Sequence, residues 1–445
     1  MAILIYLLHG DESIVPGPRH VHAAHVAFEV ACGWSFVWAQ DAEAWETVPE
    51  HLDSPAGIFR LQYGGTERRP LADDWWSASG LLERTDLTWG REVESELLSF
   101  AFFMTSRLEE YEAPGRYRDA HGRFLGGASL ASARGWLERP EVDRRMQRWA
   151  QRFRLPLGAS RQSYEVLPTF DVDSAFAYRS KGVYRTTGAL ARDMLKGRSA
   201  GERLRVVRGK ATDPYDTYER IEALHAAFAL RTRYFFLLAS RGPHDRGVTW
   251  RSAGLRALIR DLASSADIGI HQGYNAHQSG AKAIAAECNR LTAILGETEA
   301  TGMLHSRQHY LLQQPPKSWR DLQDAGIQHD HSMAYADTAG FRAGVARPFR
   351  AFDCERNERL DLWLHPVAVM DATLLRYERL SAEEAIDRVQ RLAESVAEVG
   401  GGMEMIWHNE SVSNHGEWAG SGTFPFYTAC LSASLKVAKK RARAL

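Results

Sequence analysis

The stretch LPTFDVDSAF at residues 167–176 ends an apolar run with two acids, Asp171 and Asp173. Such a run is typical of a β-strand, in which alternate side chains point to the same face. Asp171 and Asp173 are therefore expected to face one side, where two like charges are unfavourable unless a cation neutralises them. We expect that cation to be a metal ion.

The pattern that begins with this stretch predicts an α/β fold. From residue 161 onward, short apolar runs alternate with amphipathic helices, which is typical of βα units in a parallel sheet or barrel. Strands are expected at 165–173, 233–240, 266–273, 301–308, 325–333, 362–371 and 401–409.

Two helices in this half carry start signals. Ser381 and Glu384 have the spacing of a capping box, and the glycines at 400–402 end the helix that follows. Asp216 and Glu219 have the same spacing at the start of another amphipathic segment. Both helices are expected to pack an apolar face on the sheet.

The first 160 residues are expected to form a smaller α/β domain. They mix short apolar runs with tryptophan-rich loops, and the segment at 154–168 has the composition of a linker. We predict an N-terminal accessory domain of unknown role at 1–160 and a barrel at 161–445, with a basic helical insertion at about 181–212. Substrate docking, cover for one face of the barrel and homodimer formation are the roles open to the first domain.

The composition excludes several classes of protein. Lys plus Arg number 55 against 56 for Asp plus Glu, so no charge excess favours nucleic acid as a partner. No apolar run approaches the roughly 20 residues of a membrane span. The N-terminus lacks the basic region and cleavage site of a signal peptide. The four cysteines have no metal-ribbon spacing, and reduced thiols suit the cytoplasmic location that we expect.

Polar side chains gather at the carboxyl ends of the expected strands. Catalytic groups collect at that end in βα barrels, because the βα loops open there. Aspartate and histidine are ligands of a catalytic divalent metal such as zinc, whose bound water becomes a usable nucleophile. A second carboxylate can accept the proton and a distant histidine can protonate the leaving group. The residues concerned are Asp171, Asp173, His271, Arg307, His309, Asp330 and His408.

The second half of the chain resembles the polysaccharide deacetylase family, carbohydrate esterase family 4, whose fold is an irregular (β/α)7 barrel. TFDVD resembles the family's first motif, with one extra residue, and implies that Asp171 is the catalytic base and Asp173 a metal ligand. GIHQGYNAH resembles the second motif and implies that His271 is a ligand. The family's second histidine is replaced by Asn275, and the next histidine is His277.

RQHY at residues 307–310 resembles the family's third motif. It implies that Arg307 orients the base and that the backbone amide of Tyr310 helps to hold an oxyanion. His309 stands where the family has proline, and we infer that it is the third metal ligand. His277 and His305 are the alternatives. Zinc is the expected ion, with cobalt, nickel and manganese as alternatives.

The last motifs imply the remaining roles. MEMIWHN resembles the family's final motif, with His408 as general acid and Trp407 as a wall of the acetyl pocket. Asp330 resembles the later aspartate that tethers active-site side chains, and Tyr274 is expected at the substrate. His365 lies within a strand and is expected to be structural.

The stretches at 106–124, 213–221 and 334–353 resemble a bacterial subgroup of these deacetylases, in which an uncharacterised α/β domain precedes the barrel. The resemblance implies a metal-dependent hydrolase that removes an N-acetyl group from an amino-sugar glycan or its precursor, and the 13 tryptophans fit a sugar-binding cleft. Two alternatives stay open. One is an amidohydrolase of the same fold that acts on a small non-sugar amide, and the other is a glycan-binding protein without catalysis.

Overall fold

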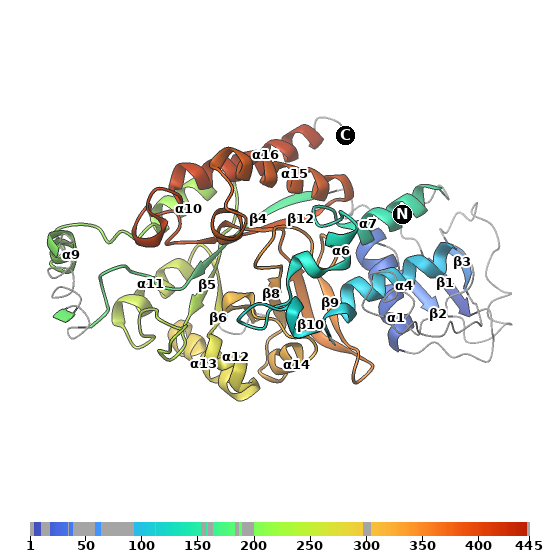
Figure 1. Ribbon diagram of the computed structural model, residues 1–445, viewed down its shortest axis with the longest axis horizontal. Coiled ribbons are helices and arrows are strands. Elements are labelled where there is room, and N and C mark those ends of the chain that lie inside the picture. The colour runs from blue at the N-terminus through green and yellow to red at the C-terminus, as the bar shows by residue number, and fades with distance from the viewer. Residues whose placement is uncertain are drawn as a thin grey trace.

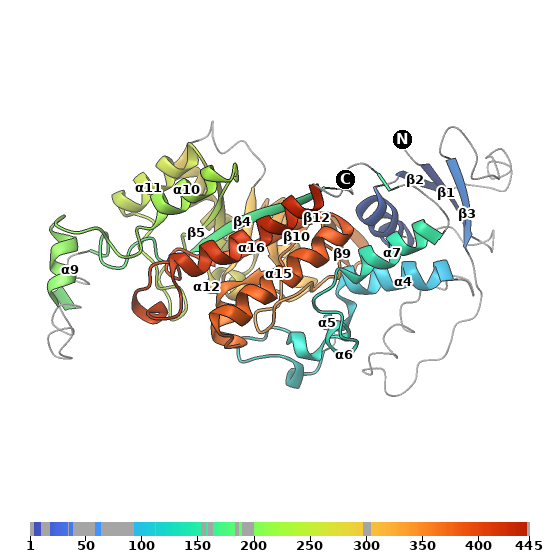
Figure 2. The same ribbon diagram turned by 90° about the horizontal axis from the view of Figure 1, so that it is seen from above.

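The structure is a computed structural model of the chain. It describes residues 4–9, 18–33, 35–38, 58–63, 93–111, 113–152, 157–158, 163–182, 187–188, 200–296 and 304–442. The predicted linker at 154–168 and the predicted insertion at about 181–212 lie partly outside these residues. Within the insertion, α9 (Ala200–Val207) is helical as expected and stands away from the other elements (Figures 1 and 2).

A small parallel sheet lies at the end of the molecule opposite to α9 (Figure 1). It has the order β2-β1-β3. The helices nearest to it in the chain bury apolar faces against one another. The elements are β1 (Leu4–His9), α1 (Pro18–Ala24), η1 (His25–Cys32), β2 (Ser35–Trp38), β3 (Ile58–Tyr63), α4 (Val93–Ser106) and α7 (Glu141–Arg152).

The large sheet has nine strands in the order β11-β12-β4-β5-β6-β7-β8-β10-β9. All neighbours are parallel except β9 and β10, which are antiparallel. A mixed α/β fold is therefore confirmed. The strands are β4 (Tyr164–Val172), β5 (Arg233–Leu237), β6 (Asp267–Gln272), β7 (His305–Gln308), β8 (His329–Met333), β9 (Phe349–Asp353), β10 (Glu358–Pro366), β11 (Val369–Met370) and β12 (Gly401–His408).

The large sheet is strongly curled. Neighbouring strands lie about 4.8 Å apart, so β7 and β12, four steps apart in the order, would be separated by roughly 19 Å in a flat sheet. Instead, Nη2 of Arg307 on β7 lies 2.5 Å from Oε1 of Glu404 on β12. Nδ1 of His331 on β8 lies 2.9 Å from the same oxygen. The sheet therefore forms a half-barrel. In place of the expected seven-stranded barrel it has nine strands, and no ladder among the described residues joins its edge strands.

Helices cover the convex face of the half-barrel. α15 and α16 lie side by side over β12 and β4 (Figures 1 and 2). Among the described residues, none of the helices combines the length and the apolar character needed to cross a membrane. The helices between and after the strands are α10 (Tyr218–Ala227), α11 (Ala253–Ala263), α12 (Tyr274–Ser279), α13 (Ala281–Leu295), α14 (Lys317–Asp324), α15 (Ala382–Val399) and α16 (Phe424–Ala442).

One of the two predicted capping boxes is present. Ser381 and Glu384 exchange both hydrogen bonds of the box at the start of α15. The prediction at α10 is wrong, because its N-cap is Thr217, which makes no side-chain capping bond. The Asp216 carboxylate instead accepts a hydrogen bond from Arg179 at 2.5 Å.

Residues 93–152 pack on the large sheet. Phe100, Met104 and Val142 belong to the same hydrophobic cluster as the strands. A short helix, α5 (Leu108–Tyr111), carries Glu110, which is fully buried and paired with Arg342 at 2.5 Å. The domain boundary near residue 160 stays a prediction, and one core extends across it.

Candidate active site

A pocket of about 630 Å³ opens at the carboxyl ends of the central strands. It contains Asp171 and Asp173 at the end of β4, His271 near the end of β6, His309 directly after β7 and His408 at the end of β12. Its lining therefore brings together most of the residues that the strand-end pattern selected. Those that line it are Asp171, Asp173, His271, His309 and His408, and Tyr310 lines it as well.

Asp173, His271 and His309 form a group whose ligand atoms all lie within 4.8 Å of one another. Nε2 of His271 and Nε2 of His309 lie 3.2 and 3.5 Å from Oδ1 of Asp173. That oxygen is buried and makes no hydrogen bond to the part of the chain that the structure describes. A carboxylate oxygen without a hydrogen-bond donor, approached by two imidazole nitrogens, fits a divalent ion such as zinc.

The other ring nitrogens of both histidines are held by acceptors. Nδ1 of His271 donates to the backbone carbonyl of Arg307 at 2.9 Å, and Nδ1 of His309 donates to Oδ1 of Asp245 at 2.9 Å. When each ring is neutral, these bonds keep the proton on Nδ1 and leave a lone pair on Nε2, as in most metal-binding histidines. Asp245 also accepts the backbone amide of Tyr274 at 2.9 Å, which fixes the carboxylate itself.

The electrostatics favour a cation between these groups. Burial opposes ionisation of Asp173, but the imidazoles of His309 and His271 hold its pKa well below the usual range. Burial likewise opposes protonation of His309, yet Asp173 and Asp245 raise its pKa to about 9. A divalent ion would displace that proton, so binding of the ion would release it.

Asp171 is held by a buried arginine. Nη1 of Arg307 donates to Oδ1 of Asp171 and to the hydroxyl of Thr169, both at 2.8 Å, and Nη2 donates to Glu404. Arg307 is fully buried, and its guanidinium also lies over the ring of Phe235. The orienting role predicted for Arg307 fits this geometry. Sequence reasoning missed Glu404, which lies within β12 rather than at its end.

His408 is paired with Asp371, which directly follows β11. Nδ1 of His408 donates to Oδ1 of Asp371 at 2.8 Å, and its backbone amide donates to Oδ2 at 2.8 Å. Although burial opposes the charge, Asp371 raises the pKa of His408 to about 10. Asp371 ends the apolar run at 362–371, so the criterion that selected the other strand ends would also have found it.

Besides Arg307 and the alternative ligand His305, four predicted site residues lie outside the pocket lining. Asp330 is the second residue of β8, far from its carboxyl end, and accepts hydrogen bonds from Ser306, Ser332 and Gln313. The tethering role predicted for Asp330 stays a prediction, whereas Asp371 is the carboxylate that holds His408. The others are Trp407, Tyr274 and His277.

Trp407 points to the face of the sheet that α16 covers, and its ring contacts Phe426 and Tyr427. The expected acetyl-pocket wall is therefore not Trp407, since neighbouring strand residues face opposite sides. Trp418 lines the pocket instead, with its ring 6.2 Å from that of His408.

His277 and Tyr274 both belong to α12. His277 is buried and lies outside the group of three, and burial lowers its pKa to about 4. The Tyr274 ring is buried and lies 5.4 Å from the ring of Tyr310, which lines the pocket. Of the alternatives for the third ligand, the geometry favours His309.

The predicted oxyanion residue has an unusual backbone. Tyr310 has φ 64°, in the left-handed region that non-glycine residues rarely adopt. Its carbonyl accepts Nη1 of Arg123 at 2.8 Å, and Arg123 also donates to the hydroxyl of Tyr377. Arg123 lines the pocket and comes from the N-terminal 160 residues, to which the sequence assigned no chemistry.

Comparisons with known proteins cover parts of the chain. The model of a family of unknown function, DUF7033, matches residues 41–155. A crystal structure of a candidate polysaccharide deacetylase from Mycobacterium smegmatis is 14% identical and covers 65% of this chain and 94% of its own, with a TM-score of 0.39. Among curated proteins, none matches the chain.

Proposed function

We propose that this protein is a metal-dependent hydrolase that removes an N-acetyl group from an amino sugar in a glycan or glycan precursor. One observation carries the proposal. A single pocket contains a potential metal-binding group, a carboxylate held by a buried arginine, and a histidine held by a carboxylate. Metal-dependent hydrolysis of an amide uses these three elements, because water must be activated and the departing amine must be protonated.

Asp173, His271 and His309 would hold the ion, with zinc the first candidate. The bound ion would polarise the acetyl carbonyl and acidify a water molecule. Asp171 would accept the proton of the attacking water, with its carboxylate oriented by Arg307. His408 would donate a proton to the amine nitrogen as the C–N bond breaks.

The pocket lining supports a sugar substrate. Tyr215, Tyr310, Tyr377 and Trp418 contribute aromatic surface beside many polar groups. Flat aromatic faces cover the apolar faces of sugar rings, while the polar groups can bind hydroxyls. The volume of about 630 Å³ is within the range of pockets for small molecules, so one or a few sugar units would fit.

The test measures acetate released from a panel of N-acetylated mono- and oligosaccharides by the zinc-loaded protein, with cyclic ureides and simple acetamides in parallel. We expect acetate from at least one amino sugar, and a 10²–10⁴-fold lower kcat for Asp171→Asn and for His408→Gln. His277→Gln is the matched control, because it removes a buried histidine of the same region that lies outside the pocket lining.

Metal content is measured in every variant. Asp171→Asn and His408→Gln should keep the metal, since neither residue belongs to the ligand group. Turnover of ureides without turnover of amino sugars would reject the substrate class. Acetate release that survives both substitutions would reject the catalytic roles.

A further inference from the structure

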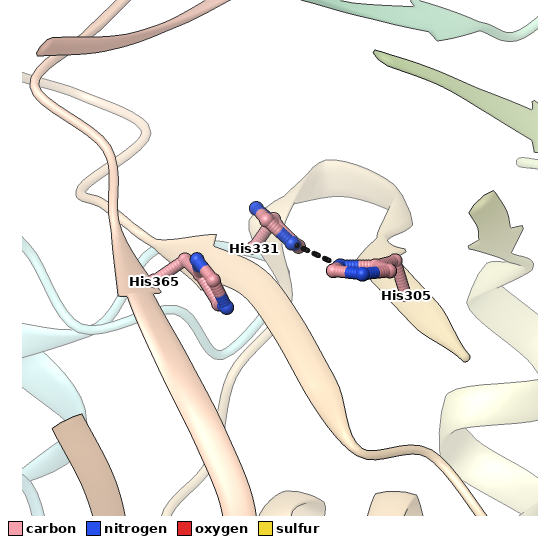
Figure 3. A group of neighbouring side chains, drawn as sticks. All are labelled: His305, His331 and His365. Atoms are coloured by element: carbon pink, nitrogen blue, oxygen red, sulfur yellow. Dashed lines mark hydrogen bonds between the residues drawn. The ribbon is translucent and has the colours of Figure 1, made fainter. Parts of the chain in front are cut away.

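A second group of histidines lies inside the half-barrel, below the pocket. His305 is the first residue of β7, two positions before Arg307, and His331 and His365 lie on β8 and β10. Their ligand atoms all lie within 4.8 Å of one another. Figure 3 shows His331 between the other two rings, with a hydrogen bond to His305.

The protonation of His331 follows from its partner. Nδ1 of His331 lies 2.9 and 3.0 Å from the two carboxylate oxygens of Glu404. A carboxylate only accepts, so this nitrogen carries the proton and Nε2 carries the lone pair. Nε2 faces Nδ1 of His305 at 2.8 Å. A histidine whose second nitrogen is held by a carboxylate is the usual form of a metal ligand.

The surroundings tolerate an added cation. The three rings lie mostly away from solvent, since His331 is fully buried and His305 and His365 are partly buried. Nη1 of Arg233 lies 3.4 Å from Nε2 of His331 and opposes a cation, but Asp267 pairs with Arg233 at 2.9 Å.

We propose that His305, His331 and His365 bind a second divalent transition-metal ion of the class that favours imidazole, such as zinc, cobalt or nickel. This site is distinct from the pocket and shares no residue with it. Glu404 connects the two, because its carboxylate accepts from both His331 and Arg307, and Arg307 holds Asp171. A second ion bound to His331 would hold Glu404 in place. Glu404 in turn positions Arg307, which orients the proposed base Asp171.

Binding requires small movements of the rings. Two nitrogens bound tetrahedrally at 2.0–2.1 Å lie about 3.3 Å apart, so His305 and His331 would separate slightly from 2.8 Å. The ring of His365 is stacked on that of His331, with centroids 3.9 Å apart. It would turn out of this stack and give up its 2.8 Å hydrogen bond to His329.

The competing explanation is a metal-free chain of neutral, hydrogen-bonded histidines. Metal content separates the two. The full chain is dialysed against zinc, and bound metal is measured for the wild type, His271→Ala and the double variant His305→Gln/His365→Gln. We expect two equivalents in the wild type and one in each variant. His329→Gln is the matched control and should keep two, because it removes a neighbouring histidine outside the group.

A cobalt titration of the wild type gives a readout that needs no substitution. Two sites should give two absorption steps, of which His271→Ala removes only one. One equivalent in the wild type, lost in His271→Ala and kept in the double variant, would overturn the second site and leave the proposed function intact. One equivalent kept in His271→Ala and lost in the double variant would support the second site and count against the pocket site.

Discussion

At the scale of single residues, the proposed base, one proposed metal ligand and the proposed acid are each held by one partner residue from another part of the chain. Arg307 holds Asp171, Asp245 holds His309, and Asp371 holds His408. These partners fix ring orientation and protonation, which the reacting residues alone do not determine. Substitution of a partner should therefore change the pH dependence of activity or the affinity for metal, although the proposed base, ligand or acid itself is unchanged.

Asp371→Asn should shift the alkaline limit of activity to lower pH. The pKa of His408 is raised to about 10, so the ring is protonated below that pH and loses its proton as the pH rises through it. A general acid acts only while protonated, and removal of the Asp371 carboxylate lowers this pKa. The measurement is kcat against pH from 6 to 11. Ser411→Ala is the control, since Ser411 also donates to Asp371 but leaves the carboxylate. If the alkaline limit of kcat is the same in Asp371→Asn as in the wild type, Asp371 does not set the pKa of the general acid His408.

Asp245→Asn should weaken metal binding in the pocket by about 10–100-fold, the usual effect of removing the partner of a metal-binding histidine. The amide side chain can present its N–H to His309 and so disfavour the required tautomer. Competition with a chromophoric chelator gives the affinity. Asp330→Asn serves as the control, because Asp330 is also buried but contacts Ser306, Ser332 and Gln313 instead. Equal affinity in the two variants would argue against Asp245.

The strand-end pattern predicted most of this site but not its support. It selected Asp173, His271 and His309 because carboxyl ends of parallel strands meet at one edge. Glu404 was not selected, since its importance arises only when the curled sheet brings β12 against β7. Local sequence patterns do not predict contacts between strands that are four positions apart in the sheet.

At the scale of elements, the segment at 115–126 completes the pocket. Arg123 donates to the carbonyl of Tyr310, whose left-handed backbone the sequence could not predict. Arg123→Gln should therefore lower kcat by roughly tenfold to a hundredfold, since misplacement of an oxyanion donor costs up to about 10³. Metal content should not change. Arg116→Gln on the same segment is the control, because Arg116 is exposed and its guanidinium donates to the Tyr117 hydroxyl and lies over the Tyr117 ring.

A loss of metal in Arg123→Gln, or an equal loss of kcat in Arg116→Gln, would show a general disturbance of the segment and not a role for Arg123. In the sequence, the stretch at 106–124 showed a resemblance to a bacterial subgroup of deacetylases but no assignable chemistry. Its contacts are with residues about 190 to 250 positions away, which explains why periodicity and spacing could not assign it.

At the scale of the whole molecule, local patterns predicted the strands better than their assembly. Every expected strand from 165 onward is present, because period and apolar content are local properties. The antiparallel strand β9 was missed, since its sequence, FRAFD, is short and carries charges. The curl of the sheet and the packing of residues 93–152 against it depend on long-range contacts.

These long-range contacts predict that a chain beginning at residue 161 will not fold. It would lose Phe100, Met104 and Val142 from the main hydrophobic cluster. It would also leave the guanidinium of Arg342 buried without Glu110, and a buried charge that loses its partner costs about 3–5 kcal/mol. That figure is comparable with the roughly 5–15 kcal/mol total stability of a domain. Thermal melts followed by circular dichroism test this: the full chain should melt cooperatively and the shorter chain should not. A cooperative melt of residues 161–445, with metal bound in the pocket, would restore the boundary at residue 160 and make the N-terminal part a separable domain.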